Sequence, residues 1–300
     1  MAASAAVGPA ELPERIACST LDGPAPRATI QALLVKKPLP TSVSTKVSDQ
    51  RLPTGYCFGE VRVVSARPMV FAHRGASAYA PENTFAAFDL AIEMGAPAME
   101  TDVQATADGH LVLLHDARVD RTTDGHGPLA DLTLAEVEAL DAGGRFDPRF
   151  AGLRVPRAEE LLARYGGRVR LRLEVKSEGV VDQLVRLVED AGLLDAVEFS
   201  SFDLDFVTQL CARAPTATVC YLVQAIDQRT IGETSAAGAR IISGRAASLT
   251  PEAMTDARRA GLEVSAWGVG DDQLLAKVIA LGVGGFTSNW PDRALRLLRD

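Results

Sequence analysis

The sequence predicts an α/β protein of the (β/α)₈ TIM-barrel class. From residue 68 to the C-terminus, short apolar runs typical of buried strands alternate with longer stretches of helical periodicity. About eight such strand-and-helix units fit into this part of the chain, which matches the count and size of a barrel. The alternative is a doubly wound open sheet, but no GxGxxG motif follows the first strand. We therefore expect the barrel.

The strands are expected where a short apolar run lies between polar or turn-forming residues. The first run, 69–72, follows a proline, and the third follows a tight Asp108-Gly109 turn. The predicted strands are residues 69–72, 98–103, 111–115, 169–175, 197–200, 218–223, 240–243, 262–267 and 285–287.

Helices are expected between these strands, and their ends carry recognisable signals. The first is opened by residues 81–84, with Asn83 or Thr84 as a candidate N-cap, and Gly95 ends it. Pro251 suits the first turn of a later helix. The predicted helices extend to residue 94 and then cover 133–140, 157–165, 180–191, 204–212, 228–236, 251–260 and 271–281, with a last one after Pro291.

Two segments fall outside this alternation. Residues 116–156 are irregular and rich in Gly and Asp, so they are expected to be an insertion in the alternation. Residues 1–66 show weak periodicity and are expected to be a partly disordered N-terminal extension. The predicted organisation is therefore an extension, 1–66, followed by a barrel domain, 67–300.

Composition and charge favour a globular protein that acts on a small molecule. The chain is 47% hydrophobic and 23% charged, and its net charge is −8, from 31 Lys and Arg against 39 Asp and Glu. The sequence has no basic stretch of the kind that binds nucleic acids, so a nucleic-acid partner is not expected. No apolar run approaches the ~20 residues of a membrane span, and the first residues lack a signal peptide pattern. A cytoplasmic protein is the expectation, and the oligomeric state stays open.

Three carboxylates stand near the ends of predicted strands. Glu100 and Asp102 are two residues apart, so their side chains point the same way, and Glu174 lies near the end of another strand. Carboxylates that converge in this way repel one another unless a cation lies between them. A hard divalent ion, Mg²⁺ or Ca²⁺, suits such oxygen ligands. The alternative is ion pairing with Arg170, Arg172 or Lys176.

Two histidines, His73 and His115, also lie near predicted strand ends. One histidine can accept a proton from a nucleophile while a second delivers one to a leaving group. Arg74 and Lys176 add positive charge suited to a phosphoryl group. The alternative is a pair of ordinary core or loop histidines. Together these groups indicate metal-assisted phosphoester chemistry.

The motifs that contain these residues resemble those of the glycerophosphodiester phosphodiesterase family. The resemblance runs in consistent order from residue 70 to the C-terminus and leaves the first 66 residues unexplained. The main motifs are His73-Arg74-Gly75, Pro81-Glu82-Asn83-Thr84, Glu100-Thr101-Asp102, His115-Asp116 and Glu174-Val175-Lys176. Smaller matches are Asp120-Arg121-Thr122-Thr123 with Gly125, Ser200-Ser201-Phe202, and Trp267.

The resemblance implies a TIM barrel with a small insertion after the second strand, and a role for each site residue. Glu82 would support the metal or orient His73, or it would simply cap the following helix. Trp267 would pack against a glycerol or alkyl group, or it is a core residue at the barrel end. The implied metal ligands are Glu100, Asp102 and Glu174, the acid/base pair is His73 and His115, and the phosphate-binding residues are Arg74 and Lys176.

Two departures from the family pattern bear on substrate preference. After Trp267 the family commonly has an asparagine, where this chain offers Gly268 and Gly270. The last strand often ends in Thr-Asp, whereas here it reads Thr287-Ser288-Asn289. Both lie at the expected catalytic mouth.

The implied activity is metal-dependent hydrolysis of glycerophosphodiesters to glycerol 3-phosphate and an alcohol. One alternative is lysophospholipase D-like cleavage of longer lipid phosphodiesters, which needs an apolar groove. Another is a non-catalytic barrel that binds a phosphate ligand, because fold does not imply function. The head group and the choice between Mg²⁺ and Ca²⁺ are left open.

Overall fold

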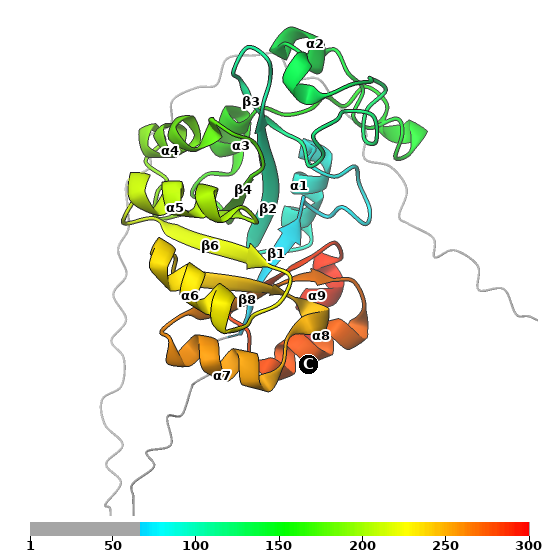
Figure 1. Cartoon of the computed structure of the whole chain (residues 1–300). Coiled ribbons are helices and arrows are strands. Elements are labelled where there is room, and N and C mark those ends of the chain that lie inside the picture. Colours follow the sequence, from blue (N-terminus) through cyan, green and yellow to red (C-terminus); the bar gives the residue numbers. More distant parts are fainter. Residues whose placement is uncertain (1–66, 300) are drawn as a thin grey trace, which may run out of the picture. The chain divides into compact units, whose positions relative to one another are not determined.

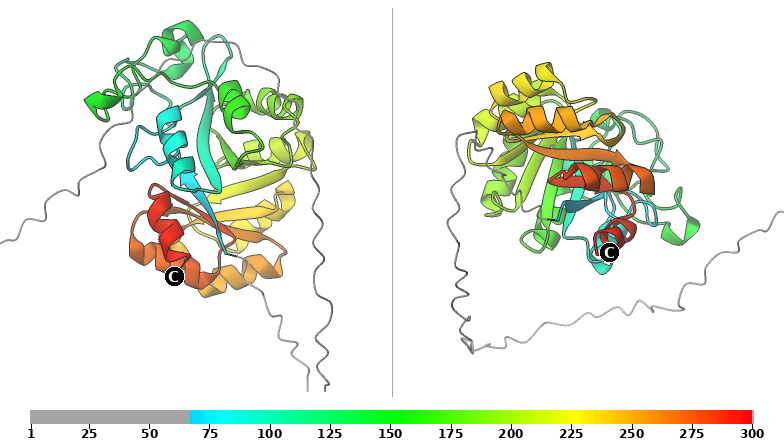
Figure 2. Two further views of the ribbon diagram at one scale, coloured as in Figure 1. Left: turned by 180° about the vertical axis from the view of Figure 1, so that it is seen from behind. Right: turned by 90° about the horizontal axis from the view of Figure 1, so that it is seen from below.

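The computed structural model describes residues 67–299, which form a closed barrel of parallel strands surrounded by helices (Figures 1 and 2). Eight parallel strands make the wall, in the order β1, β9, β8, β7, β6, β5, β4, β2, and pairing of β1 with β2 closes it. Their bounds are β1 Met69–His73, β2 Ala98–Ala105, β4 Arg170–Val175, β5 Val197–Ser201, β6 Thr218–Val223, β7 Ile241–Arg245, β8 Glu263–Val269 and β9 Gly285–Ser288. The predicted fold is confirmed.

The predicted extension, 1–66, lies outside the described residues, so the division into an extension and a barrel domain stays a prediction. No helix within residues 67–299 is long and apolar enough to cross a membrane.

Alternation along the strands separates two layers of side chains. On β4, Leu171, Leu173 and Val175 pack into the main apolar core between barrel and helices. The intervening Arg172 and Glu174 therefore point into the barrel, since successive residues of a strand face opposite sides. The same alternation on β2 directs Glu100 and Asp102 inward. The barrel interior thus holds charged side chains, and its outer wall is apolar.

The helices cover the outer wall with their apolar faces. In α4 the buried residues Val181, Leu184, Val185 and Val188 recur at helical spacing. Thr84, rather than Asn83, is the N-cap of α1, and its side chain accepts from the Ala87 amide. The helix bounds are α1 Phe85–Glu93, α2 Leu134–Glu138, α3 Ala158–Tyr165, α4 Val180–Asp190, α5 Leu204–Arg213, α6 Gln228–Ala237, α7 Pro251–Arg259, α8 Asp272–Leu281 and α9 Pro291–Leu297.

The insertion follows β2 and has a small apolar core of its own, which includes Val119, Leu129 and Val137. It contains α2 and two short 3₁₀ helices, and Figure 1 shows it beyond the end of β2. The predicted strand 111–115 is shorter than expected, since β3 covers only Leu111–Leu113. It pairs antiparallel with the end of β2, so it is a hairpin arm and not a barrel strand. His115 lies two residues beyond it.

Candidate active site

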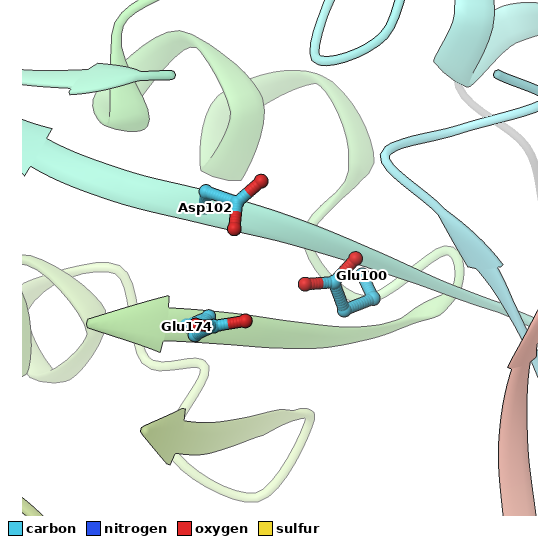
Figure 3. Close-up of side chains that lie close together, drawn as sticks. All are labelled: Glu100, Asp102 and Glu174. Atoms are coloured by element: carbon cyan, nitrogen blue, oxygen red, sulfur yellow. The ribbon is translucent and has the colours of Figure 1, made fainter. Parts of the chain in front are cut away.

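The three predicted carboxylates converge at the end of the barrel where the parallel strands terminate. Asp102 on β2 and Glu174 on β4 are register partners, and Glu100 is two residues earlier on β2. One oxygen from each of the three lies within 4.8 Å of the others, and all three side chains are buried. Figure 3 shows the three side chains close together, Glu100 and Asp102 on one strand and Glu174 on its neighbour. The structure therefore brings the predicted ligand set together.

Two cations accompany these three carboxylates. Arg74 Nε lies 3.1 Å from Asp102 Oδ2, and Lys176 Nζ lies 2.8 Å from Glu174 Oε1 and 3.6 Å from Asp102 Oδ1. Lys176 therefore provides part of the ion pairing considered as an alternative to a metal. Arg170 and Arg172 do not, because their ion pairs are with Glu198.

Arg74 and Lys176 do not fully neutralise the three carboxylates, as the direction of their pKa shifts indicates. Burial, and then the charge of Asp102, raise the pKa of Glu100 and of Glu174 to about 8. Burial also disfavours the charged form of Asp102, yet Arg74 and Lys176 hold the pKa of this carboxyl below its usual value. Asp102 Oδ1 is buried and has no hydrogen-bond partner among residues 67–299. A buried carboxylate oxygen that has an ion-pair contact with Lys176 but no hydrogen bond, inside an acidic cluster, suits a hard cation.

His73 is at the end of β1, beside the acidic cluster. Its Nδ1 lies 2.5 Å from Asn289 Oδ1, and its Nε2 lies 3.8 Å from Glu100 Oε2. Because an amide oxygen accepts hydrogen bonds, Nδ1 carries the proton and Nε2 is left as the acceptor of the neutral ring. Burial and the charge of Arg74 lower the pKa of His73 to about 4, so the ring is neutral at physiological pH.

His115 is held in a similar way from the insertion side. Its Nδ1 lies 2.6 Å from Asp116 Oδ1, and its side chain is half-buried. The carboxylate accepts from Nδ1–H, which leaves Nε2 free. Burial is the main cause of the lowered pKa of His115, and the nearby Asp102 and Asp116 oppose it. Each predicted acid/base residue thus presents Nε2 while a partner fixes Nδ1.

An ion-pair chain links the two sides of the site. Glu82 Oε1 accepts from Arg74 Nη1 at 2.9 Å. Both Glu82 oxygens also accept from Arg121, each at 2.8 Å, and Arg121 Nε donates to Asp116 Oδ2 at 2.6 Å. Glu82 therefore connects two arginines and makes no hydrogen bond with His73, which is oriented by Asn289. It does not cap α1 either, because Thr84 does.

Two left-handed residues and a glycine shape the loop between β1 and α1. Arg74 and Asn83 have φ of 56° and 55°, a costly conformation for side chains that are not glycine. Asn83 is buried there, donates to Asp102 Oδ2 at 3.0 Å and accepts from Thr101 at 2.7 Å. At Gly75, with φ of 82°, a Cβ would come within 2.5 Å of the Ala87 backbone. The close packing of this loop on α1 requires that glycine.

Trp267 on β8 lies at the same end of the barrel and is half-buried. Its Nε1 donates to the Val223 carbonyl at 2.9 Å, and its ring meets that of Phe202 edge-to-face, with centroids 5.1 Å apart. Phe202 is 41% exposed. Gly268, noted as a departure from the family pattern, has φ of 71° at an irregularity between β8 and β9.

The Glycerophosphoryl diester phosphodiesterase family matches residues 73–293 of this chain. The chain belongs to this family. A putative glycerophosphodiester phosphodiesterase of Bacillus subtilis is 37% identical over 233 residues, covering 74% of this chain and 95% of that protein. A glycerophosphodiester phosphodiesterase of Caldanaerobacter subterraneus is 33% identical, covering 78% and 98%. The protein is therefore a phosphodiesterase enzyme.

Solved structures show the same fold. A glycerophosphodiester phosphodiesterase from Agrobacterium tumefaciens is 33% identical with a TM-score of 0.69, and the match covers 75% of this chain and 97% of that one. An Oleispira antarctica phosphodiesterase, solved in complex with the product sn-glycerol-3-phosphate, is 29% identical with a TM-score of 0.72, covering 78% and 97%. The family resemblance seen in the motifs is confirmed.

Several residues that contact the predicted site of this phosphodiesterase were not assigned a role from the sequence. Asn83 was expected only as a candidate cap, and Asp116 and Arg121 were noted only as members of motifs. Asn289 was noted only as a departure from the family pattern, yet it bonds to His73. The position of Asn289, a polar residue two beyond the predicted strand 285–287, indicates the barrel mouth, although it does not indicate which residue Asn289 contacts.

Proposed function

We propose that this enzyme hydrolyses glycerophosphodiesters to glycerol 3-phosphate and an alcohol, in a reaction that depends on one divalent metal ion, Mg²⁺ or Ca²⁺. The observation that carries this proposal is the buried acidic cluster at the barrel mouth, flanked by two histidines that each present Nε2. The relative from Oleispira antarctica, whose structure contains sn-glycerol-3-phosphate, supports the product.

The metal ligands would be Glu100, Asp102 and Glu174. Asp102 Oδ1, which is buried without a hydrogen bond, and the excess of carboxylates over the cations that pair with them fit this assignment. When bound, such an ion polarises a phosphoryl oxygen and offsets the negative charge that develops there.

The histidines would move the protons of the reaction. In the overall reaction the bond from phosphorus to the alcohol oxygen breaks, the leaving alkoxide receives a proton, and a water oxygen ends up bonded to phosphorus. Either water attacks phosphorus directly, or the neighbouring glycerol hydroxyl first forms a cyclic phosphate that water then opens. His73, neutral and with Nε2 free, and His115, with Nε2 free near the mouth, are the acid/base pair. Either order of roles fits this geometry.

The remaining residues would bind and position the substrate. Arg74 and Lys176 lie beside the carboxylates and supply positive charge for the phosphoryl group. Glu82 has a supporting role because it fixes Arg74 and Arg121. Trp267, with Phe202 against it, offers an apolar face to the glycerol carbons. The substrate is a small molecule, and the cytoplasmic location expected from the sequence stays a prediction.

The test is release of glycerol 3-phosphate from glycerophosphoethanolamine by the purified full chain. We expect EDTA to abolish release, and either Mg²⁺ or Ca²⁺ to restore it. Full activity in excess EDTA would contradict the metal site. Absence of glycerol 3-phosphate under every metal condition would contradict the proposed reaction.

A further inference from the structure

A cavity of about 220 Å³ lies next to the site, between the β1–α1 loop and the insertion. Glu82 and Arg121 belong both to its wall and to the ion-pair chain that reaches Arg74 and His115. The cavity is smaller than the ~300–1,000 Å³ of pockets for drug-sized ligands, so it suits a small head group and not an acyl chain. The residues that line it are Ser77, Pro81, Glu82, Arg121, Thr122, Ala142, Arg145 and Phe146.

The charge of this cavity is positive. Its one carboxylate, Glu82, is occupied by Arg74 and Arg121, and Arg121 is shared with Asp116. Arg145 is exposed, and among residues 67–299 it has no side-chain hydrogen bond or ion pair, so its guanidinium can pair with an anionic ligand in this cavity. Such a cavity attracts an anion and repels a trimethylammonium group.

The turn that carries Arg145 is well held. Asp141 Oδ1 accepts from the amides of Gly143 and Gly144 at 2.8 and 2.9 Å, and the Phe146 amide donates to the Gly143 carbonyl at 3.0 Å. The guanidinium is therefore presented from an ordered turn, which lowers the entropy lost when a ligand binds.

Two other residues that line the cavity, Ser77 and Phe146, have side-chain atoms available to a ligand. Ser77 Oγ is buried and has no hydrogen-bond partner in the described part of the chain, so it can bond to a polar atom of a ligand. Phe146 is 46% exposed, and its ring packs edge-to-face on Phe150 alone among the aromatic residues described. An exposed ring beside a charged group suits a ligand with short methylene carbons and a polar end.

We propose that this cavity is the subsite for the leaving alcohol, and that Arg145 makes it selective for alcohols that carry a carboxylate or another anionic group. This inference rests on the proposed function, because the cavity can select an alcohol only if the enzyme cleaves diesters. A serine-type head group fits this proposal, since it is small and carries a carboxylate that can pair with Arg145. A choline-type head group would be disfavoured, because its trimethylammonium cation would lie against the positive charge of Arg145.

Two substrates that differ by one carboxylate test the subsite, namely glycerophosphoserine and glycerophosphoethanolamine. We expect kcat/KM of the unmodified enzyme to favour the serine diester by roughly five- to tenfold, as for one partly exposed charge-assisted contact. In Arg145→Gln that ratio should fall toward one, with most of the change in KM of the serine diester.

Arg149→Gln is the matched control. Arg149 also lies on the insertion, but it pairs with Asp147 and does not line the cavity, so this variant should keep the ratio of the unmodified enzyme. A ratio of one or less in the unmodified enzyme, or a ratio that Arg145→Gln leaves unchanged, would overturn the subsite while the proposed function stands. Failure to cleave either diester would overturn the proposed function itself.

Discussion

Each histidine of the site gains its orientation from a single polar neighbour. Asn289 holds Nδ1 of His73, and Asp116 holds Nδ1 of His115. Because the hydrogen bond at Nδ1 fixes the orientation of the ring, Nε2 points in one direction. Proton transfer at a defined atom requires such a fixed orientation. The two partners differ in charge, so the carboxylate of Asp116 favours a protonated His115 more than the amide of Asn289 favours a protonated His73.

His115→Ala should lower kcat by about 10²-fold or more and leave folding intact, because a general acid or base contributes about that factor. His115 is half-buried outside the barrel wall, so its loss leaves no large cavity. His110→Ala is the control, since His110 is exposed and its side chain forms its ion pair with Asp108, at 4.0 Å. Measuring kcat together with the melting temperature separates a loss of catalysis from a loss of stability. Equal activity of the two variants would remove His115 from the acid/base pair.

Site residues could be predicted from the sequence where a charged residue or a histidine lies near the end of a predicted strand. Glu100, Asp102, Glu174 and His115 all do so, and these residue types indicate a metal site with proton transfer. The contact of Asn289 with His73 spans 216 residues and exists only because β9 pairs with β1. Nothing local identifies Asn289 as the partner of that ring.

At the scale of elements, the insertion is joined to the barrel mouth through Arg121. This side chain makes a two-pronged contact with Glu82 of the β1–α1 loop and a second contact with Asp116. Hydrogen bonds and charge of Arg121, working against partial burial, hold the pKa of Glu82 and of Asp116 below their usual values. A carboxyl group whose pKa is lowered by folding stabilises the folded state above its ordinary pKa.

Arg121→Gln should lower the Tm at pH 7 by roughly 2–4 °C, as expected for a network of partly exposed ion pairs. The difference from the unmodified enzyme should narrow as the pH falls below about 4.5. There the unfolded state takes up protons on Glu82 and Asp116 before the folded state does, so the stabilisation by Arg121 is lost.

Melting curves from pH 3 to pH 7 measure this difference, with Arg149→Gln as a surface control that should show none of it. A Tm difference that is constant across the range would show that Arg121 acts through packing and not through its charge.

The elements themselves were largely predictable, for a physical reason. Buried parallel strands read as continuous apolar runs, and helices carried periodic faces with caps such as Thr84 and Pro251. The strand predicted over 111–115 exists, but β3 ends at Leu113, and its antiparallel pairing with β2 could not be predicted. A short apolar run after a tight turn looks the same whether it joins a barrel or forms a hairpin arm. Which strands pair with one another depends on the tertiary structure, and the periodicity of the sequence does not reveal it.

At the scale of the whole molecule, the barrel is complete within the described residues. Its wall closes through the pairing of β1 with both β2 and β9, and β1 begins only at Met69. Inside it, Arg172 and Glu198 form a buried ion pair, with Arg172 Nε 2.6 Å from Glu198 Oε1. The described residues belong to one compact unit. All the residues assigned to the acidic cluster, the histidines and the cavity belong to this unit.

Removal of residues 1–60 should therefore leave a folded, active enzyme. We expect the Tm to stay within a few degrees of the full chain, since neither barrel closure nor the main apolar core among residues 67–299 requires the deleted part. Melting followed by circular dichroism, together with kcat/KM for glycerophosphoethanolamine, measures both properties. Loss of a cooperative transition would mean that the extension completes the fold. A normal transition with a large loss of kcat/KM would mean instead that the extension contributes to the site.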